Sequence, residues 1–195
     1  MCNKDTNNPD GTSQYIGLDV GSGNTCKKFT TKFIFEKRSY SGTVAMIFNP
    51  NGITAGSQIL AKSVHVVLTN TYVSVALLLN SQNAFYSAHN FASPLPLDGV
   101  TENTMTIEVS GNTISVTVNG NTYTDAVTGL DVSEFNGRYA LFEFFCLGDR
   151  TIKAMPQYTY MKLEDDNSHV IEDDFQRPNG LLTVTPNGTP YSVYT

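Results

Sequence analysis

The residues best suited to acid–base or nucleophilic chemistry are scattered along the sequence. The three histidines, His65, His89 and His169, lack the paired spacing that zinc sites and catalytic triads use. No Gly-x-Ser-x-Gly elbow is present. The glycine-rich stretch 21–23 follows a predicted strand, but no helix is predicted after it, so the helix N-terminus that would hold a phosphate is missing. The pattern therefore favours a protein that is not an enzyme.

Aromatic and amide side chains gather around the stretch 81–96, which is the longest irregular stretch that the sequence predicts. Aromatic faces stack on sugar rings, and amides can bond sugar hydroxyls. Long loops on a rigid sheet are frequent binding sites. We expect a carbohydrate-binding loop site here, or else aromatic side chains that close one end of the fold or face a partner protein. The candidate residues are Tyr72, Asn83, Tyr86, Asn90 and Phe91.

The charge of the chain limits its partners. Its 195 residues carry a net charge of −6, which disfavours a nucleic-acid partner. The basic residues cluster between positions 27 and 38, and we interpret them as a solvated sheet edge. They are Lys27, Lys28, Lys32, Lys37 and Arg38. No apolar run reaches the roughly 18 residues of a membrane helix, so no membrane span is expected.

Short strands separated by turn residues are predicted over most of the chain. Apolar residues alternate with polar ones over 105–109 and again over 114–118, on either side of a glycine-containing turn. The stretch 126–135 comes nearest to a helical pattern and predicts at most one helical turn. Such a series of strands is typical of an all-β, two-sheet antiparallel β-sandwich or jelly roll. Further strands are predicted over 14–20, 25–36, 43–48, 63–69, Tyr72–Leu79, 84–89, 138–147, 158–163 and 169–175.

Three segments carry a family likeness. The first is 14–20 with the following Gly23-Asn24-Thr25, the second is the hairpin 106–120 ending in Val-Asn-Gly, and the third is 160–175. Together they resemble the concanavalin A-like jelly rolls of lectins and glucanases, the superfamily that also holds laminin G-like domains. Modules of this kind are common in bacteriophage structural proteins and in bacterial surface proteins. The resemblance implies a concanavalin A-like β-sandwich over 14–175.

The resemblance also implies sites that can be sought in the sequence. Glucanases of this superfamily carry paired carboxylates in a Glu-x-Asp-x-x-Glu pattern, and none is found. The acidic triplets 164–166 and 172–174 lie beside turns, where we expect solvated carboxylates. Calcium is often held between loops in this superfamily, but no defined ligand spacing is present, so no cofactor is predicted and calcium is kept as the alternative. The oxygen donors available for calcium are Asp19, Asp98, Asp165 and Asp166.

The ends of the chain are interpreted separately, as an N-terminal arm over 1–13 and a C-terminal tail over 176–195. The tail has two apolar segments bounded by proline, and we expect it to pack on a sheet edge or on a partner. Its interface candidates are Leu181, Val184, Tyr191 and Tyr194. Of the cysteines, Cys26 and Cys146 could pair only if their strands were neighbours, and Cys146 is expected in the core.

Two functions are expected from these observations. The first is a structural component of a bacteriophage virion, decorating a capsid or associated with a tail or fibre. It would contact other virion proteins or copies of itself, and could adhere to surface glycans. The alternative is a carbohydrate-binding module that is secreted or held at a bacterial cell surface, as a lipoprotein anchored through Cys2.

Overall fold

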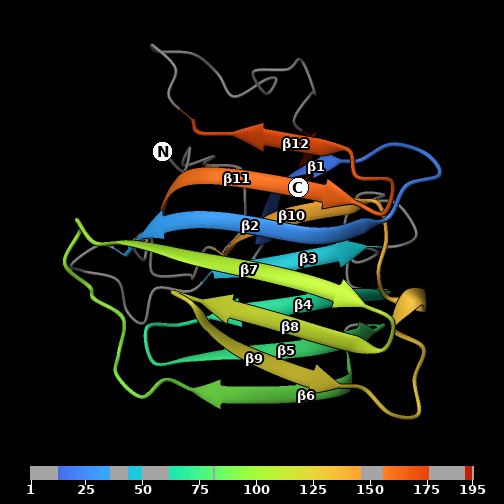
Figure 1. Ribbon diagram of the computed structural model, residues 1–195, viewed down its shortest axis with the longest axis horizontal. Helices are drawn as coiled ribbons and strands as arrows, with labels where there is room; N and C mark the ends of the chain where they lie inside the picture. Colours follow the sequence, from blue (N-terminus) through green and yellow to red (C-terminus); the bar gives the residue numbers. More distant parts are fainter. Residues whose placement is uncertain are drawn as a thin grey trace.

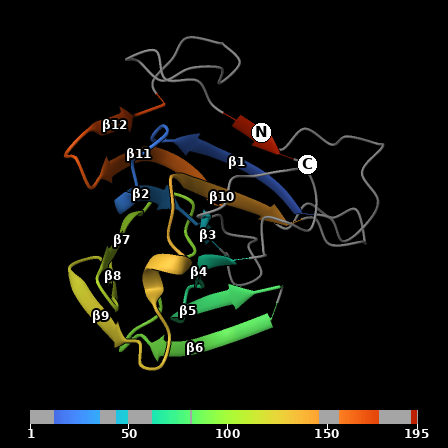
Figure 2. The ribbon, with the colours of Figure 1, turned by 90° about the vertical axis from the view of Figure 1, so that its right-hand side faces the viewer.

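Two antiparallel β-sheets face each other in the computed structural model (Figures 1 and 2). The structure describes residues 13–35, 44–49, 62–80, 82–145, 156–175 and 192–194. One sheet has seven strands in the order β13-β1-β10-β3-β4-β5-β6, and the other has six in the order β12-β11-β2-β7-β8-β9. Within these ranges, no helix has the length and hydropathy that a membrane crossing requires.

The strands are short, as the spacing of turn residues predicts. They are β1 (Ser13–Asp19), β2 (Cys26–Ile34), β3 (Val44–Asn49), β4 (Lys62–Leu68), β5 (Tyr72–Leu79), β6 (Gln82–Asn90), β7 (Glu102–Ser110), β8 (Thr113–Val118), β9 (Asn121–Ala126), β10 (Tyr139–Phe145), β11 (Gln157–Asp165), β12 (Val170–Asp173) and β13 (Ser192–Tyr194). A 3-10 turn, η2 (Val132–Glu134), lies inside the stretch where at most one helical turn is expected.

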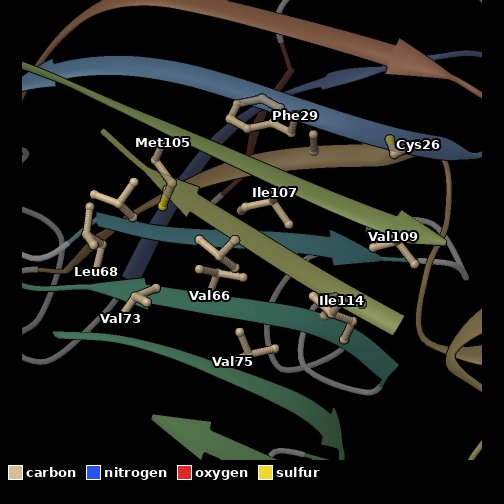
Figure 3. Close-up of a cluster of buried hydrophobic side chains, with 14 of the residues drawn as sticks. Cys26, Phe29, Val66, Leu68, Val73, Val75, Met105, Ile107, Val109 and Ile114 are labelled. Carbon is tan, nitrogen blue, oxygen red and sulfur yellow. The ribbon is translucent and has the colours of Figure 1, made fainter. Parts of the chain in front are cut away.

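The core lies between the sheets and consists largely of alternate residues from strands of both sheets (Figure 3). Phe29 of β2 and Ile107 of β7 come from the six-stranded sheet, and both are fully buried. Val66 of β4 and Val75 of β5 meet them from the seven-stranded sheet, at 0% and 1% exposure. Because side chains alternate along a strand, this burial places the intervening residues on the outer faces of the sheets.

The hairpin from β8 to β9 shows how local sequence sets the register. Val118 pairs with Asn121, so Asn119 and Gly120 form a two-residue connection. Both have positive φ, 47° and 84°. A type I′ turn requires this conformation, and asparagine followed by glycine adopts it most readily.

The described members of the basic cluster, Lys27, Lys28 and Lys32, are not at a sheet edge, so that expectation is wrong for them, while Lys37 and Arg38 lie outside the described residues. β2 pairs with β11 on one side and with β7 on the other. On the outer face, Lys28 pairs with Glu108 at 3.9 Å and Lys32 with Glu102 at 3.1 Å. The glutamates of the neighbouring strand β7 allow lysines in the middle of a sheet, because opposite charges on adjacent strands attract.

Core packing gives a direct test of the layered arrangement. Phe29→Ala removes a fully buried ring and should lower the free energy of unfolding by about 3–5 kcal/mol in urea denaturation. The matched control is the adjacent outward residue, Thr30→Ala, which loses a 3.1 Å hydroxyl contact with Thr106 and should cost about 1 kcal/mol. Equal losses for the two variants would contradict the inward and outward assignment.

Candidate functional site

Four of the five expected binding residues lie on one outer surface of the seven-stranded sheet. Tyr72 is opposite Asn90, Tyr86 is opposite Ala76, and Asn83 is opposite Leu78. Opposed residues of an antiparallel pair project from the same face of a sheet. We call this surface the β4–β6 outer face. Its outward positions are Ser63, His65, Val67, Tyr72, Ser74, Ala76, Leu78, Asn83, Tyr86, Ala88 and Asn90.

All four residues, expected as loop candidates, lie in strands: Tyr72 and Tyr86 fall within the strands predicted over Tyr72–Leu79 and 84–89, whereas Asn83 and Asn90 lie where β6 extends beyond its predicted bounds. Tyr72 belongs to β5, and the other three belong to β6, which covers most of the predicted irregular stretch. β6 is the last strand of its sheet, and its inward positions are Phe85, Ser87 and His89. Only the first of these is strongly apolar, so the alternation that marks a strand is weak here.

The fifth candidate, Phe91, lies elsewhere. It follows β6, donates its amide to the carbonyl of Thr71 at 2.9 Å, and is half-buried against the core. Its ring lies 5.8 Å from the ring of Tyr123 on β9. Phe91 therefore helps to close the end of the sandwich, which was the expected alternative to binding.

Exposure on the β4–β6 outer face is concentrated on β6, where Asn83, Tyr86, Ala88 and Asn90 are exposed. Tyr86 is 56% exposed, whereas Ala76 and Leu78 are each 7% exposed and Ser74 is 6% exposed. Ala76 stands between His65 and Tyr86 in the cross-strand row, so a small side chain separates two rings. A flat ligand placed on this row would meet the phenol ring of Tyr86 first.

The two outer faces differ in charge. None of the outward positions on the β4–β6 outer face is Asp, Glu, Lys or Arg. The outer face of the six-stranded sheet carries ion pairs, among them Lys162 with Glu164 at 2.8 Å, and rows of hydroxyls such as Thr117 and Thr122 at 2.9 Å. Charge therefore favours the β4–β6 outer face for an uncharged ligand.

A Ser-His-Asp cluster that sequence reasoning missed joins the two sheets. The Nε2 atom of His89 on β6 lies 3.1 Å from both carboxylate oxygens of Asp125 on β9 and 3.2 Å from the Oγ of Ser87. The ring of His89 also lies 5.3 Å from that of Tyr123. Asp125 lies 36 residues from His89 in the sequence, so no local motif predicts the cluster.

This cluster has the composition of a catalytic triad but not its geometry. In a triad, the serine and the aspartate bind opposite nitrogens of the imidazole, so that one end takes the proton while the other is held. Here Ser87 and Asp125 both contact the Nε2 atom of His89. The arrangement links the two sheets and does not activate Ser87.

The four aspartates considered for calcium bind protein groups instead. Asp19 accepts from Arg138 at 2.8 Å, and Asp166 accepts from the amide of Thr25 at 3.0 Å. Hydrogen bonds from the hydroxyl and amide of Thr101 and from the amide of Val100 lower the pKa of Asp98 to about 2. In the part of the chain that the structure describes, no group of His, Cys, Asp and Glu side chains is arranged to hold a metal ion.

Two acidic residues beside turns are buried, so the expectation of solvated carboxylates is wrong for them. Asp165 is 2% exposed and Asp173 is 1% exposed. Burial raises the pKa of Asp165, but hydrogen bonds from the amide and ring of His169 and from the amide of Asn167 outweigh it and hold the pKa below its ordinary value. Asp165 thus fixes the turn between β11 and β12.

Burial also governs the one cysteine that the structure describes. Cys26 is a free thiol in the core, and burial, with the nearby charges of Asp19 and Asp165, raises its pKa well above the ordinary value. A thiol in this state is a poor nucleophile. Cys146 lies outside the described residues, so its pairing stays open.

Of the tail candidates, Leu181, Val184 and Tyr191 also lie outside the described residues, and Tyr194 lies in β13, where it pairs with Tyr15 of β1.

The architecture has parallels among solved structures. The mouse laminin alpha1 chain, domains LG4-5, matches with a TM-score of 0.50 and 12% identity over 86% of this chain and 45% of that one. The fold is the concanavalin A-like jelly roll. The carbohydrate binding module CBM66 from Bacillus subtilis matches this jelly roll at a TM-score of 0.46 and 13% identity, over 77% of this chain and 84% of that one.

A glycoside hydrolase family 16 endo-glucanase from Bacteroides ovatus matches at a TM-score of 0.46 and 13% identity, over 83% of this chain and 80% of that one. At these identities the likeness is one of fold alone. No protein-family model matches the sequence, and no curated protein matches it either.

The buried turn carboxylate predicts a pH dependence of this jelly roll's stability. Because the pKa of Asp165 is lower in the folded state, its contribution is present above the unfolded pKa, about 4, and is lost as the pH falls through the folded value. Asp165→Asn should cost about 2 kcal/mol at pH 7, and the difference from wild type should shrink below pH 4.

Urea denaturation across this pH range measures the effect. His169→Gln serves as the control, because it removes a 71% exposed ring but keeps the two backbone donors to Asp165. It should cost less than Asp165→Asn. A cost of Asp165→Asn that does not change with pH would contradict the assignment.

Proposed function

We propose that this protein is a non-catalytic binding module that holds an uncharged carbohydrate on its β4–β6 outer face. The observation that carries the proposal is the position of Tyr86, a 56% exposed aromatic ring on a sheet face without charged side chains. An exposed tyrosine offers an apolar ring for stacking and a hydroxyl for hydrogen bonding. Few other ligand classes need both on a neutral surface.

The amides around Tyr86 suit a chain of sugars better than a single one. Asn83 and Asn90 lie on either side of Tyr86 along β6, and both are exposed. At about 3.3 Å per residue, the distance between these two asparagines is roughly 23 Å. Each amide can donate and accept, as a ligand with many hydroxyls requires. Tyr72, opposite Asn90, adds a second aromatic ring to the same surface.

The carboxylates support binding without catalysis. Glycoside hydrolysis requires two carboxyl groups facing one cleft, about 5 Å or more apart. On the six-stranded sheet, Glu102, Glu108 and Glu164 are each paired with a lysine. No carboxylate occupies an outward position of the β4–β6 outer face. A sugar placed beside Tyr86 would therefore be held and not cleaved.

A glycan array followed by calorimetric titration of the hits tests the proposal. Tyr86→Ala should weaken binding of a neutral oligosaccharide about tenfold or more, since the loss of one stacking ring at about 1.4 kcal/mol changes affinity tenfold. The control is Val170→Ala, which shortens an exposed apolar side chain on β12 of the other sheet. It should leave the affinity unchanged. An array without hits, or equal losses in the two variants, would refute the carbohydrate site.

A second candidate function is a structural role in a bacteriophage virion, through contacts with other virion proteins or copies of the same chain. The observation that favours it is β13, a three-residue strand that pairs with β1 of its own chain at the outer edge of the seven-stranded sheet, since the same segment can make this pairing with β1 of a neighbouring copy. Strand addition at a sheet edge is a common way to connect proteins in an assembly.

Location separates the two candidates. Immunogold labelling with an antibody to this protein should mark phage particles if it is a virion component. It should mark the bacterial envelope, or the protein should be found in the medium, if it is a surface or secreted module. Labelling of particles alone would make carbohydrate binding secondary to assembly. Labelling of the envelope alone would exclude the virion role.

A further inference from the structure

The four strands that end the two sheets differ in how well they are protected against pairing with another chain. β13 has only three residues as described. β12 has four, and they include Glu172 and Asp173. β9 directs the carboxylate of Asp125 inward to His89. Short strands and charges at an edge, including inward-pointing ones, are the usual means of preventing strand addition.

β6 is longer than the other three strands and, apart from His89, which points inward to Asp125, carries no side chain of this kind. It runs for nine residues and contains no Lys, Arg, Asp, Glu or Pro. Among the described residues it pairs only with β5, and it forms the outermost element at its end of the sandwich (Figures 1 and 2). A register shift opposite Leu77 and Leu78 interrupts it only near its start, so the rest of the strand is regular. Its free backbone groups form a template for another strand.

We propose that the free edge of β6 pairs with β6 of a second copy of this protein, antiparallel and about a two-fold axis near Ser87. Such pairing would join the two seven-stranded sheets into one continuous sheet. The contact is isologous, which means that both copies use the same strand and that every contact between two residues occurs twice. The inference does not rest on carbohydrate binding, because backbone pairing requires no ligand.

Charge favours a second copy as the occupant. The chain has a net charge of −6, so most contacts between two copies would bring like charges together. β6 is a long edge without charged side chains, so that repulsion is absent at the point of contact. A basic partner protein would gain nothing from this strand and would be drawn to acidic surfaces instead.

The sizes of the facing side chains also favour a second copy of the chain as the partner of β6. With the axis at Ser87, Tyr86 of each copy lies opposite Ala88 of the other, on the outer face. Tyr86 is 56% exposed and Ala88 is exposed, so a large ring would cover a small side chain twice in each dimer. Cross-strand neighbours of this kind are about 5 Å apart at Cβ and stabilise sheets. One strand pair buries less area than a stable obligate interface, so the dimer should be reversible.

Sedimentation equilibrium of the full chain, without any sugar, tests the proposal. Between about 10 and about 500 μM, the range for a pairing of this size, the average mass should rise from that of a monomer toward that of a dimer. Ala88→Lys adds one charge to β6, and should leave the protein monomeric over the same range. The control is Ala126→Lys, which adds the same charge at an exposed position of β9 and should dimerise as wild type does.

Thermal unfolding of both variants shows that they are folded, since each lysine replaces an exposed alanine at the end of a sheet. Two results would overturn the proposal. One is wild-type protein that stays monomeric at the highest concentration. The other is Ala88→Lys protein that dimerises as readily as the Ala126→Lys control, which would place the contact elsewhere.

Discussion

The shared core between the two sheets is the constraint on which the rest of this jelly roll depends. Phe29, Ile107, Val66 and Val75 come from four different strands and are excluded from water together. Because side chains alternate along a strand, burying these residues assigns every intervening residue to an outer face. The positions of Tyr86 on one face and of Lys28 on the other follow from this division. The packing of the core therefore determines which residues lie on the outer faces, where a ligand can reach them.

The two outer faces differ because their sequences differ at the outward positions. On the six-stranded sheet, lysines face glutamates, and hydroxyls such as those of Ser115 and Thr124 bond each other at 3.1 Å. These side chains satisfy one another and stabilise the sheet. On the β4–β6 outer face, the outward positions are small, aliphatic, aromatic or amide-bearing, and the cross-strand row of the exposed Tyr86 ring contains no Asp, Glu, Lys or Arg. That difference is the physical basis for placing a neutral ligand there.

Much of the fold could be predicted from local sequence. The alternation over 105–118 and the Asn119-Gly120 turn specify β7, β8 and β9, because these signals depend on neighbours in the chain. β6 was harder to predict, since an edge strand that buries Ser87 and His89 shows little hydrophobic alternation. Only 84–89 was predicted as a strand, within a stretch otherwise expected to be irregular, and four of the five candidate binding residues share one face once the strands are paired.

Contacts between distant residues were beyond local patterns altogether. The pairing of His89 with Asp125 and the hydrogen bond from Thr25 to Asp166, 141 residues away, arise only when the sheets are in place. Likewise, the run of acidic residues at 164–166 does not reveal that Asp165 is buried by its own turn. Charged residues are usually solvated, and the exceptions depend on donors that tertiary structure supplies.

The central claim is that a neutral carbohydrate binds beside Tyr86, on the exposed part of the β4–β6 outer face. Amide chemical-shift mapping during titration with a neutral oligosaccharide identified on the array tests it most directly, because it reports on every strand at once. The account predicts that the largest shifts lie in β5 and β6, around Tyr72, Tyr86 and Asn90, and that the outer face of β7, β8 and β9 is unaffected. Shifts concentrated on the six-stranded sheet would contradict it.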